Sequence, residues 1–259
     1  MICVIRNGDY LRPDNPIFGL ANSMFRIATG YSCAKRLGTN FVCKNLPGYE
    51  QRYKDNIFRN IVVDESFIPK NIYHEKSFEY SPIDFINDGD GLWGYWQSEK
   101  YFNDCEDEIR ELFSPTLDIQ KYIDERYGDL ISDSTSIHVR RGDYLNHPNH
   151  HPVCSIDYYL SAIEKIGGHK FTIFSDDIKW CKEIFEGDAF TFIEGEQDYI
   201  DLWLMSQCKN NIIANSSFSW WGAWLNNNKD KKVIAPKLWF GNSLSHNISD
   251  LLPEQWIKI

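Results

Sequence analysis

The stretch "NIIANSSFSWWGAWLN" (residues 211–226) joins an apolar run to a helical pattern through a short polar turn. The apolar run 212–214 predicts a buried strand. Phe218, Trp221 and Leu225 then recur at the spacing of one helix face. A strand that turns directly into a helix is the building unit of a parallel α/β sheet.

The same unit repeats through the second half of the chain, where short apolar runs alternate with helical patterns. This alternation predicts a parallel sheet with helices on both faces. Ligands of such sheets bind outside the carboxyl ends of the strands. The predicted strands are 137–139, 171–174, 190–193, 212–214 and 233–235, and the predicted helices are 157–166, 178–185, 198–209 and 217–226.

The first half is less regular. Strands are predicted at 2–5 and 39–43, and helices at 23–37, 99–113 and 117–130. The aromatic stretch between the second strand and residue 98 has no clear period. We place the linker in "ISDSTS" (131–136), which predicts an N-terminal domain of residues 1–132 and a C-terminal domain of residues 133–259.

Composition limits the function. The 259 residues carry a net charge of −10, which argues against nucleic acid or an anionic membrane surface as a binding partner. No apolar run reaches the 18 residues of a spanning helix, so no integral membrane segment is expected. Seven scattered cysteines without a Cys-x-x-Cys pair indicate reduced thiols and a cytoplasmic protein.

The stretch "SIHVRRGDY" (136–144) ends a predicted strand with Arg140 and Arg141. These arginines either pair with some of the 37 acidic residues or hold an anion. Ser216 and Ser217 either cap the helix that they begin or offer hydroxyl and N–H groups to an anion. Two anion-compatible features at strand ends favour a pyrophosphate, which arginine forks bind in a bidentate way.

Three aspartates also have two interpretations each. Asp176 and Asp177 lie between a strand and a helix, where one of them caps the helix or, as the alternative, they have a ligand role. Asp201 lies in the first turn of a predicted helix, where an acid is favourable. A carboxylate at that position could also accept two hydrogen bonds from the N1–H and N2–H edge of guanine.

Metal signals are weak. Asp88-Gly-Asp90 has the Asp-x-Asp form of metal-dependent sugar transferases, but it lies in a glycine-rich turn. His147, His150 and His151 occur beside prolines, which break any ligand spacing. We therefore expect no metal and no cofactor.

Several motifs occur together in a recognisable order. They are "FGLANSMFRIATGYSCAKRLG" (18–38), "GYWQSEKYF" (94–102), "HVRRGDY" (138–144), "VCSIDYY" (153–159), "FSDDIKWCK" (174–182), "DLWLMSQCKNNIIANSSFSWW" (201–221) and "VIAPKLWF" (233–240). With them the chain resembles the α-1,2-fucosyltransferase family over most of its length. The arginine motif and the Ser-Phe-Ser-Trp-Trp motif are specific as a pair.

The resemblance implies two Rossmann-like domains of the GT-B type and an inverting, metal-independent transfer of L-fucose from GDP-fucose to a glycan. His138 would contact the nucleoside, Arg140 the β-phosphate, and Asp201 the guanine. One departure lies at Ala21, where the family has a glycine whose conformational freedom alanine lacks. The predicted donor contacts are His138, Arg140, Asp176, Asp201, Ser216, Ser217, Phe218, Ser219, Gly19 and Asn22.

Arg140 and the helix start near Ser217 are expected to stabilise the leaving pyrophosphate. Asp143 is a candidate for the base that takes the acceptor proton, and pairing with a motif arginine is its alternative. Trp93, Tyr95 and Trp96 are candidate acceptor contacts. The alternative functions are another GDP-sugar transferase of the same superfamily, or a non-catalytic glycan-binding module that uses these aromatic residues.

Overall fold

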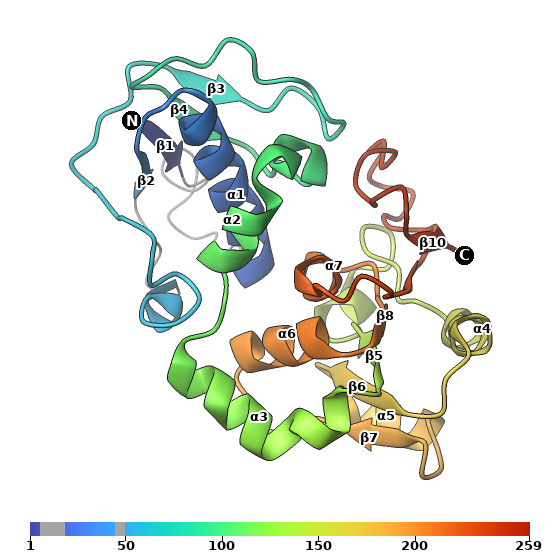
Figure 1. Cartoon of the computed structure of the whole chain (residues 1–259). Helices are drawn as coiled ribbons and strands as arrows, with labels where there is room; N and C mark the ends of the chain where they lie inside the picture. Colours follow the sequence, from blue (N-terminus) through green and yellow to red (C-terminus); the bar gives the residue numbers. More distant parts are fainter. Residues whose placement is uncertain (6–18, 45–49) are drawn as a thin grey trace. The chain divides into compact units, whose positions relative to one another are not determined.

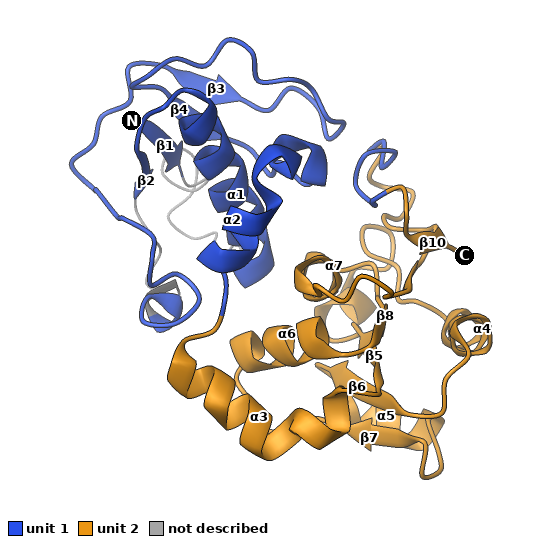
Figure 2. Cartoon of the chain, viewed as in Figure 1, with its two compact units in different colours: residues 1–114, 246–253 blue, residues 115–245, 254–259 orange. Residues whose placement is uncertain are grey.

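The computed structural model describes residues 1–5, 19–44 and 50–259, which form two compact units (Figures 1 and 2). Unit 1 contains residues 1–114 and 246–253, and unit 2 contains residues 115–245 and 254–259. The division expected from the sequence, at 132/133, falls after helix α3 (Leu117–Ile131), which belongs to unit 2. The expected linker 131–136 therefore lies inside unit 2, from the last residue of α3 into the start of its first strand.

Unit 1 is built on a four-stranded parallel sheet. Its order is β2 (Phe41–Lys44), β1 (Ile2–Ile5), β4 (Gly91–Trp93) and β3 (Ile72–His74). Helix α1 (Leu20–Arg36) connects β1 to β2 and contacts both. Strands β3 and β4 lie in the stretch that the sequence analysis left irregular. They have three residues each, too few to show alternation, and hydrogen bonds to neighbouring strands define them.

The helix expected over 99–113 is interrupted. The chain makes 3₁₀ turns at Glu99–Tyr101 and Asn103–Cys105 before α2 (Glu106–Leu112) begins. Between the two turns Phe102 has φ −144°, which is incompatible with a helix, and its side chain is fully buried. Burial of this ring explains why the local helical pattern does not continue.

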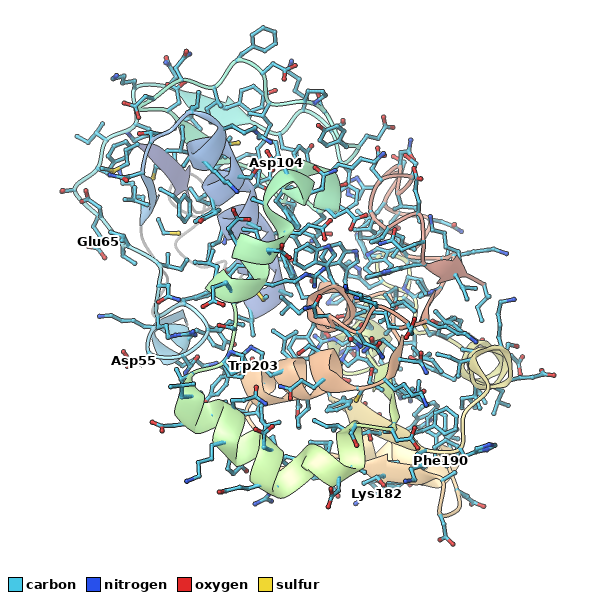
Figure 3. The ribbon with its side chains drawn as sticks, viewed as in Figure 1. Asp55, Glu65, Asp104, Lys182, Phe190 and Trp203 are labelled. Carbon is cyan, nitrogen blue, oxygen red and sulfur yellow. The ribbon has the colours of Figure 1, made fainter. Side chains whose placement is uncertain are left out.

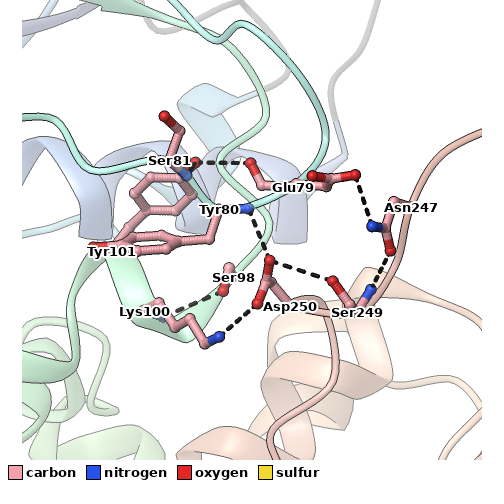
Figure 4. A network of polar contacts seen from close by, with 9 residues as sticks. All are labelled: Glu79, Tyr80, Ser81, Ser98, Lys100, Tyr101, Asn247, Ser249 and Asp250. Carbon is pink, nitrogen blue, oxygen red and sulfur yellow. Dashed lines mark hydrogen bonds and ion pairs between the residues drawn. The ribbon is translucent and has the colours of Figure 1, made fainter.

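The segment 246–253 is bound into unit 1 by polar contacts (Figure 4). The Asp250 carboxylate accepts the backbone N–H of Tyr80 (3.2 Å) and pairs with the Lys100 ammonium (2.5 Å). Asn247 Nδ2 donates to Glu79 Oε1 (2.7 Å). The carboxylate of Asp250, far along the chain, therefore holds loop residues from the middle of unit 1.

Unit 2 is built on a six-stranded parallel sheet of order β10-β9-β8-β5-β6-β7. Ile137, Ile173 and Ile212 from three adjacent strands form the centre of its core, and Trp203 is buried in a helix that packs beside it (Figure 3). The strands and helices after α3 are β5 (Thr135–Val139), α4 (Ile156–Ile166), β6 (Phe171–Ser175), α5 (Ile178–Ile184), β7 (Phe190–Phe192), α6 (Asp198–Gln207), β8 (Asn210–Ile212), α7 (Ser217–Leu225), β9 (Val233–Ala235) and β10 (Ile257–Lys258).

The strands and helices predicted for the second half are thus confirmed to within about three residues at each end, while β10 was not predicted. In the described part of the chain, no helix combines the length and the hydropathy needed to cross a membrane. All seven cysteines are free thiols, and six of them are buried.

Candidate donor site at the carboxyl edge of the second sheet

Three adjacent strands of unit 2 bring the predicted anion ligands to one edge of the sheet. Arg140 directly follows β5, Asp176 directly follows β6, and Ser216 lies in the turn after β8. The sheet order β8-β5-β6 makes these strand ends neighbours, and all three strands run parallel. The edge is therefore a place where polar groups from three loops converge.

Arg140 is held by two carboxylates. Its Nη2 lies 2.6 Å from Asp143 Oδ1, and its Nη1 lies 3.0 Å from Asp176 Oδ2. The guanidinium also lies over the Tyr144 ring, 5.3 Å from the centroid. With its side chain about one-third exposed (35%), Arg140 can exchange a carboxylate for another anion.

Arg141 has a different environment. Its Nε lies 3.0 Å from Asp177 Oδ2, and its guanidinium stacks on Trp180 at 3.9 Å from the ring centroid. Its side chain is more buried than that of Arg140. Of the two alternatives given for the arginines, Arg141 pairs with an acidic residue; this carboxylate lies within unit 2 and not at the junction of the two domains, where we expected it.

The two adjacent aspartates divide the two roles that the sequence left open. Asp177 is the N-cap of α5, because its carboxylate accepts the backbone N–H of Trp180. Asp176 instead accepts the backbone N–H of Arg141 (2.9 Å) and pairs with Arg140. A Cβ atom at Gly142 would lie 2.6 Å from Asp176 Oδ2, so a larger residue at this position would displace the carboxylate. Asp176 acts here on the arginine, and direct contact with a donor stays a prediction.

The start of α7 keeps both of its expected properties. The Ser216 hydroxyl caps the helix by accepting the N–H of Phe218 (3.3 Å). Other N–H groups of a first helical turn have no partner within the helix and are available to an anion. Ser217 is partly exposed, whereas the buried Ser219 hydroxyl donates to backbone carbonyls, including that of Ala214. Ser219 can therefore act through its backbone rather than its side chain.

His138 is buried beside Phe218, with the two ring centroids 5.5 Å apart. Burial and the neighbouring Arg140 charge lower the pKa of His138 to about 3, so the ring is neutral. Its Nδ1 has no hydrogen-bond partner among the described residues. A buried polar atom of this kind is rare unless a ligand or water completes it.

Asp201 lies in the first turn of α6, which packs against α7. Burial, and then the charges of Glu196 and Asp198, raise the pKa of Asp201 to about 7. One of its carboxylate oxygens, Oδ1, is buried and accepts no hydrogen bond from the residues that the structure describes. The carboxylate therefore has an unused acceptor at neutral pH.

Asn215 is a residue that the sequence analysis did not select. Its side-chain Nδ2 donates to the backbone carbonyl oxygens of Pro152 (2.8 Å) and Trp239 (2.9 Å). Its backbone carbonyl oxygen accepts the Tyr144 hydroxyl (3.1 Å). It thus ties together the loops after β5, β8 and β9, directly before the N-cap of α7. The available signal was an asparagine at the end of an apolar strand, which alone indicates only a turn.

In unit 1, Gly19 and Asn22 lie at the start of α1. The Gly19 carbonyl accepts the N–H of Asn22 (3.1 Å), and Asn22 Oδ1 accepts Gln97 Nε2 (2.8 Å). Ala21 lies inside α1, where the backbone needs no glycine, so its departure from the family pattern causes no strain. Phe18, the first residue of this motif, lies outside the described residues.

The predicted acceptor aromatics differ in exposure. Tyr95 is 40% exposed, and Trp93 is partly exposed and lies 5.0 Å from the His74 ring centroid. Trp96 is only 1% exposed and packs against Tyr101 in an edge-on contact. The expectation that Trp96 stacks on a sugar is therefore wrong, because its ring is part of the unit 1 core.

The residues that gave the weak metal signals make other contacts, and the expectation that the chain needs no metal stays a prediction. Asp88 pairs with the N-terminal amine and accepts the Thr39 hydroxyl, and Asp90 accepts Asn71 Nδ2. His150 and His151 both donate their backbone N–H groups to the carbonyl of His147 in a turn. Within the described ranges, no three His, Cys, Asp or Glu side chains come together as a metal site.

The fold and this edge define an α/β protein with a candidate anion site at the carboxyl ends of parallel strands. The model of glycosyl transferase family 11 matches residues 90–259, and the chain belongs to this family. Two relatives from Escherichia coli support the assignment. An alpha-1,2-colitosyltransferase is 36% identical, with 93% of this chain and 96% of the relative covered. The O-antigen biosynthesis glycosyltransferase WbnK is 34% identical, with 88% and 81% covered.

Among solved structures, the NodZ alpha-1,6-fucosyltransferase soaked with GDP-fucose matches with a TM-score of 0.53 at 13% identity. The match covers 86% of this chain and 92% of that one. Both sheets of the present chain are parallel and flanked by helices, and the fold is of the GT-B type. Membership of the family makes the chain a glycosyltransferase, which removes the non-catalytic glycan-binding module from the alternatives.

Proposed function

We propose that this chain is an inverting transferase that moves L-fucose from GDP-fucose to O-2 of a terminal β-galactoside, forming an α-1,2 linkage. The observation that supports this most is the convergence of Arg140 and the start of α7 at neighbouring strand ends. A guanidinium fork and the N–H groups of a helix start are both suited to phosphate oxygens. Together they suit the pyrophosphate of a nucleotide sugar.

We assign recognition of the guanine base of the donor to Asp201 and His138. Guanine offers two adjacent donors, N1–H and N2–H, and an ionised carboxylate can accept both. Asp201 Oδ1 is buried without a partner in the described part of the chain, and so is Nδ1 of His138. A nucleoside that satisfied these atoms would remove the cost of leaving them unpaired.

Inversion of the configuration at the anomeric carbon defines the geometry of the reaction. The acceptor hydroxyl attacks the anomeric carbon of fucose on the face opposite GDP, while the bond to the β-phosphate oxygen breaks and GDP leaves with the electron pair. Arg140 and the start of α7 stabilise the negative charge that develops on GDP. This electrostatic role takes the place of a divalent metal, and the donor substrate is the one small molecule required besides the acceptor.

The acceptor proton needs a base, for which Asp143 remains the candidate. Asp143 is 62% exposed and pairs with Arg140 at 2.6 Å in the ligand-free chain. When Arg140 turns to the β-phosphate, this ion pair opens and frees the carboxylate. The ion pair therefore links donor binding to the availability of the base.

Colitose is the alternative to fucose as the transferred sugar, because one of the E. coli relatives is a colitosyltransferase. The test presents GDP-L-fucose, GDP-colitose and GDP-mannose separately with a panel of β-galactosides, and maps the product linkage by NMR. We expect transfer from GDP-L-fucose and an α-1,2 product. Use of GDP-colitose in preference to GDP-L-fucose would reassign the donor. Transfer from neither GDP-L-fucose nor GDP-colitose would contradict the proposal.

A further inference from the structure

The turn at 94–97, directly after β4, is locally strained. Trp96 has φ +59°, and it is the one non-glycine residue with positive φ in the described part of the chain. Its indole Nε1 is buried and has no hydrogen-bond partner among the described residues. A bulky residue in this region of φ is strained and persists where its surroundings enforce it, most often at functional sites.

The residue that enforces this turn is Glu75, which follows β3. Its Oε2 accepts the backbone N–H of Tyr95 (2.6 Å), and its Oε1 accepts the backbone N–H of Trp96 (3.0 Å). The approach is so close that a Cβ atom on Gly94 would lie 2.5 Å from Glu75 Cβ. One carboxylate thus fixes both peptide groups of the strained turn.

The same turn is fixed from a second side. Gln97 is buried, and its Nε2 donates to Asn22 Oδ1 (2.8 Å) in the first turn of α1. Trp96 packs into the core while Tyr95, its neighbour, is 40% exposed. The strained turn therefore buries the Trp96 ring and leaves the ring of the preceding residue, Tyr95, at the surface.

The location of the turn is also that of a ligand site. It lies at the carboxyl ends of the paired strands β3 and β4, the edge where parallel sheets bind ligands. An exposed tyrosine offers an apolar face with a polar tip, which suits the C–H face of a neutral sugar ring. Each Glu75 oxygen is occupied by a backbone N–H group, so this carboxylate serves the turn rather than a ligand.

We propose that Glu75 is a positioning residue that holds the Tyr95–Trp96 turn so that the Tyr95 ring contacts the acceptor sugar. This inference rests on the proposed function, since it assigns the acceptor side of that reaction. Burial raises the pKa of Glu75, and its two backbone hydrogen bonds oppose that shift. Both effects on the pKa agree with a carboxylate that is bonded to the turn and is shielded from solvent.

The test measures acceptor KM, kcat and the Kd for GDP in Glu75→Gln, Tyr95→Ala and Tyr95→Phe. An amide can accept one of the two N–H groups but turns its own N–H₂ toward the other, so Glu75→Gln should raise acceptor KM by about tenfold or more. Tyr95→Ala should raise it similarly, and Tyr95→Phe should leave it nearly unchanged because the ring is kept. The Kd for GDP should stay constant in all three.

Glu65→Gln is the matched control, because Glu65 lies in the same unit and is exposed. Its acceptor KM should equal that of the unmutated chain. The double variant Glu75→Gln/Tyr95→Ala should be no worse than the poorer single variant, since both remove one contact. Additive effects, or an acceptor KM unchanged in Tyr95→Ala, overturn the inference and leave the proposed function intact. An unmutated chain that transfers to no galactoside overturns the proposed function itself.

Discussion

The carboxyl edges of the two sheets differ in how they use charge. In unit 2 the edge exposes an arginine between two aspartates, next to the start of a helix. In unit 1 the edge presents an aromatic turn, and its carboxylate, Glu75, is consumed by backbone N–H groups. One edge therefore carries a partly exposed arginine that can exchange its anion, and the other presents an aromatic side chain beside a carboxylate already bonded to its own turn. The contrast agrees with the nucleotide-sugar donor and the glycan acceptor proposed above.

The largest expected effect tests the charged edge. Arg140→Lys should lower kcat/KM by roughly ten- to ten-thousand-fold, because lysine keeps the charge but cannot form two parallel hydrogen bonds to a phosphate. Arg141→Lys should have a milder effect on turnover. It should lower the melting temperature, because the stacking on Trp180 and the pairing with Asp177 are structural.

Steady-state kinetics and thermal melts of both lysine variants check this assignment. A chain that keeps its activity as Arg140→Lys but loses it as Arg141→Lys would show that the two arginines have been assigned in reverse. Full activity of both variants would place the pyrophosphate elsewhere and remove the contrast between the two edges.

The next effect concerns the nucleobase. Asp201→Asn replaces one acceptor oxygen by a donor, so the affinity for GDP should fall by about five- to more than a hundredfold. Calorimetric titration with GDP measures it, and a melt shows that the variant is folded. Equal GDP affinity in the variant would mean that Asp201 serves only to stabilise the N-terminus of α6.

A smaller effect is expected from pH. Because the pKa of Asp201 is raised to about 7, mainly by burial, the carboxyl is largely protonated at pH 6 and ionised at pH 8. The ionised form accepts both guanine donors, so GDP affinity should rise by about tenfold over this range. The free energy of unfolding should change in the opposite direction, since the folded state binds the extra proton below pH 7.

Asp201→Asn serves as the reference for that measurement, since titration of the GDP phosphate affects both proteins equally. The difference between their pH dependences isolates the carboxyl. Parallel curves for the two proteins would contradict the role of Asp201 in base recognition.

The smallest expected effect is that of a chelator. If Arg140 and the start of α7 neutralise the leaving group, EDTA should leave turnover essentially unchanged. An initial-rate assay with and without EDTA, followed by addition of Mn²⁺, tests this. Activity lost to EDTA and restored by Mn²⁺ would return attention to Asp88 and Asp90.

Much of unit 2 could be predicted because its helices and strands are regular. The period of 3.6 in α7 and the apolar run of β5 are local signals, and each was placed close to its observed range. The pairing of Arg140 with Asp176 could not be predicted, since it depends on β5 and β6 being neighbours in the sheet. Strand order is a property of the whole fold and leaves no local pattern.

Unit 1 was harder to predict for a related reason. Strands β3 and β4 are too short for alternation, so they exist through their neighbours. The sequence "GYWQ" identifies aromatic side chains but not which of them is buried. That choice is made by Glu75, about twenty residues earlier in the chain, through backbone contacts that no spacing rule predicts.

The division of the chain has a consequence for fragments. The polypeptide passes from unit 1 to unit 2 at 114/115, returns at 245/246 and leaves again at 253/254. A fragment of residues 1–114 would lack Asp250, the carboxylate that binds Tyr80 and Lys100, and a fragment of residues 115–245 would lack β10 at the sheet edge. Neither unit is therefore a contiguous piece that can be excised whole. A cut at 114/115 would leave every residue of unit 2 in the polypeptide 115–259, whereas the polypeptide 1–114 would need segment 246–253 from that second piece to complete unit 1.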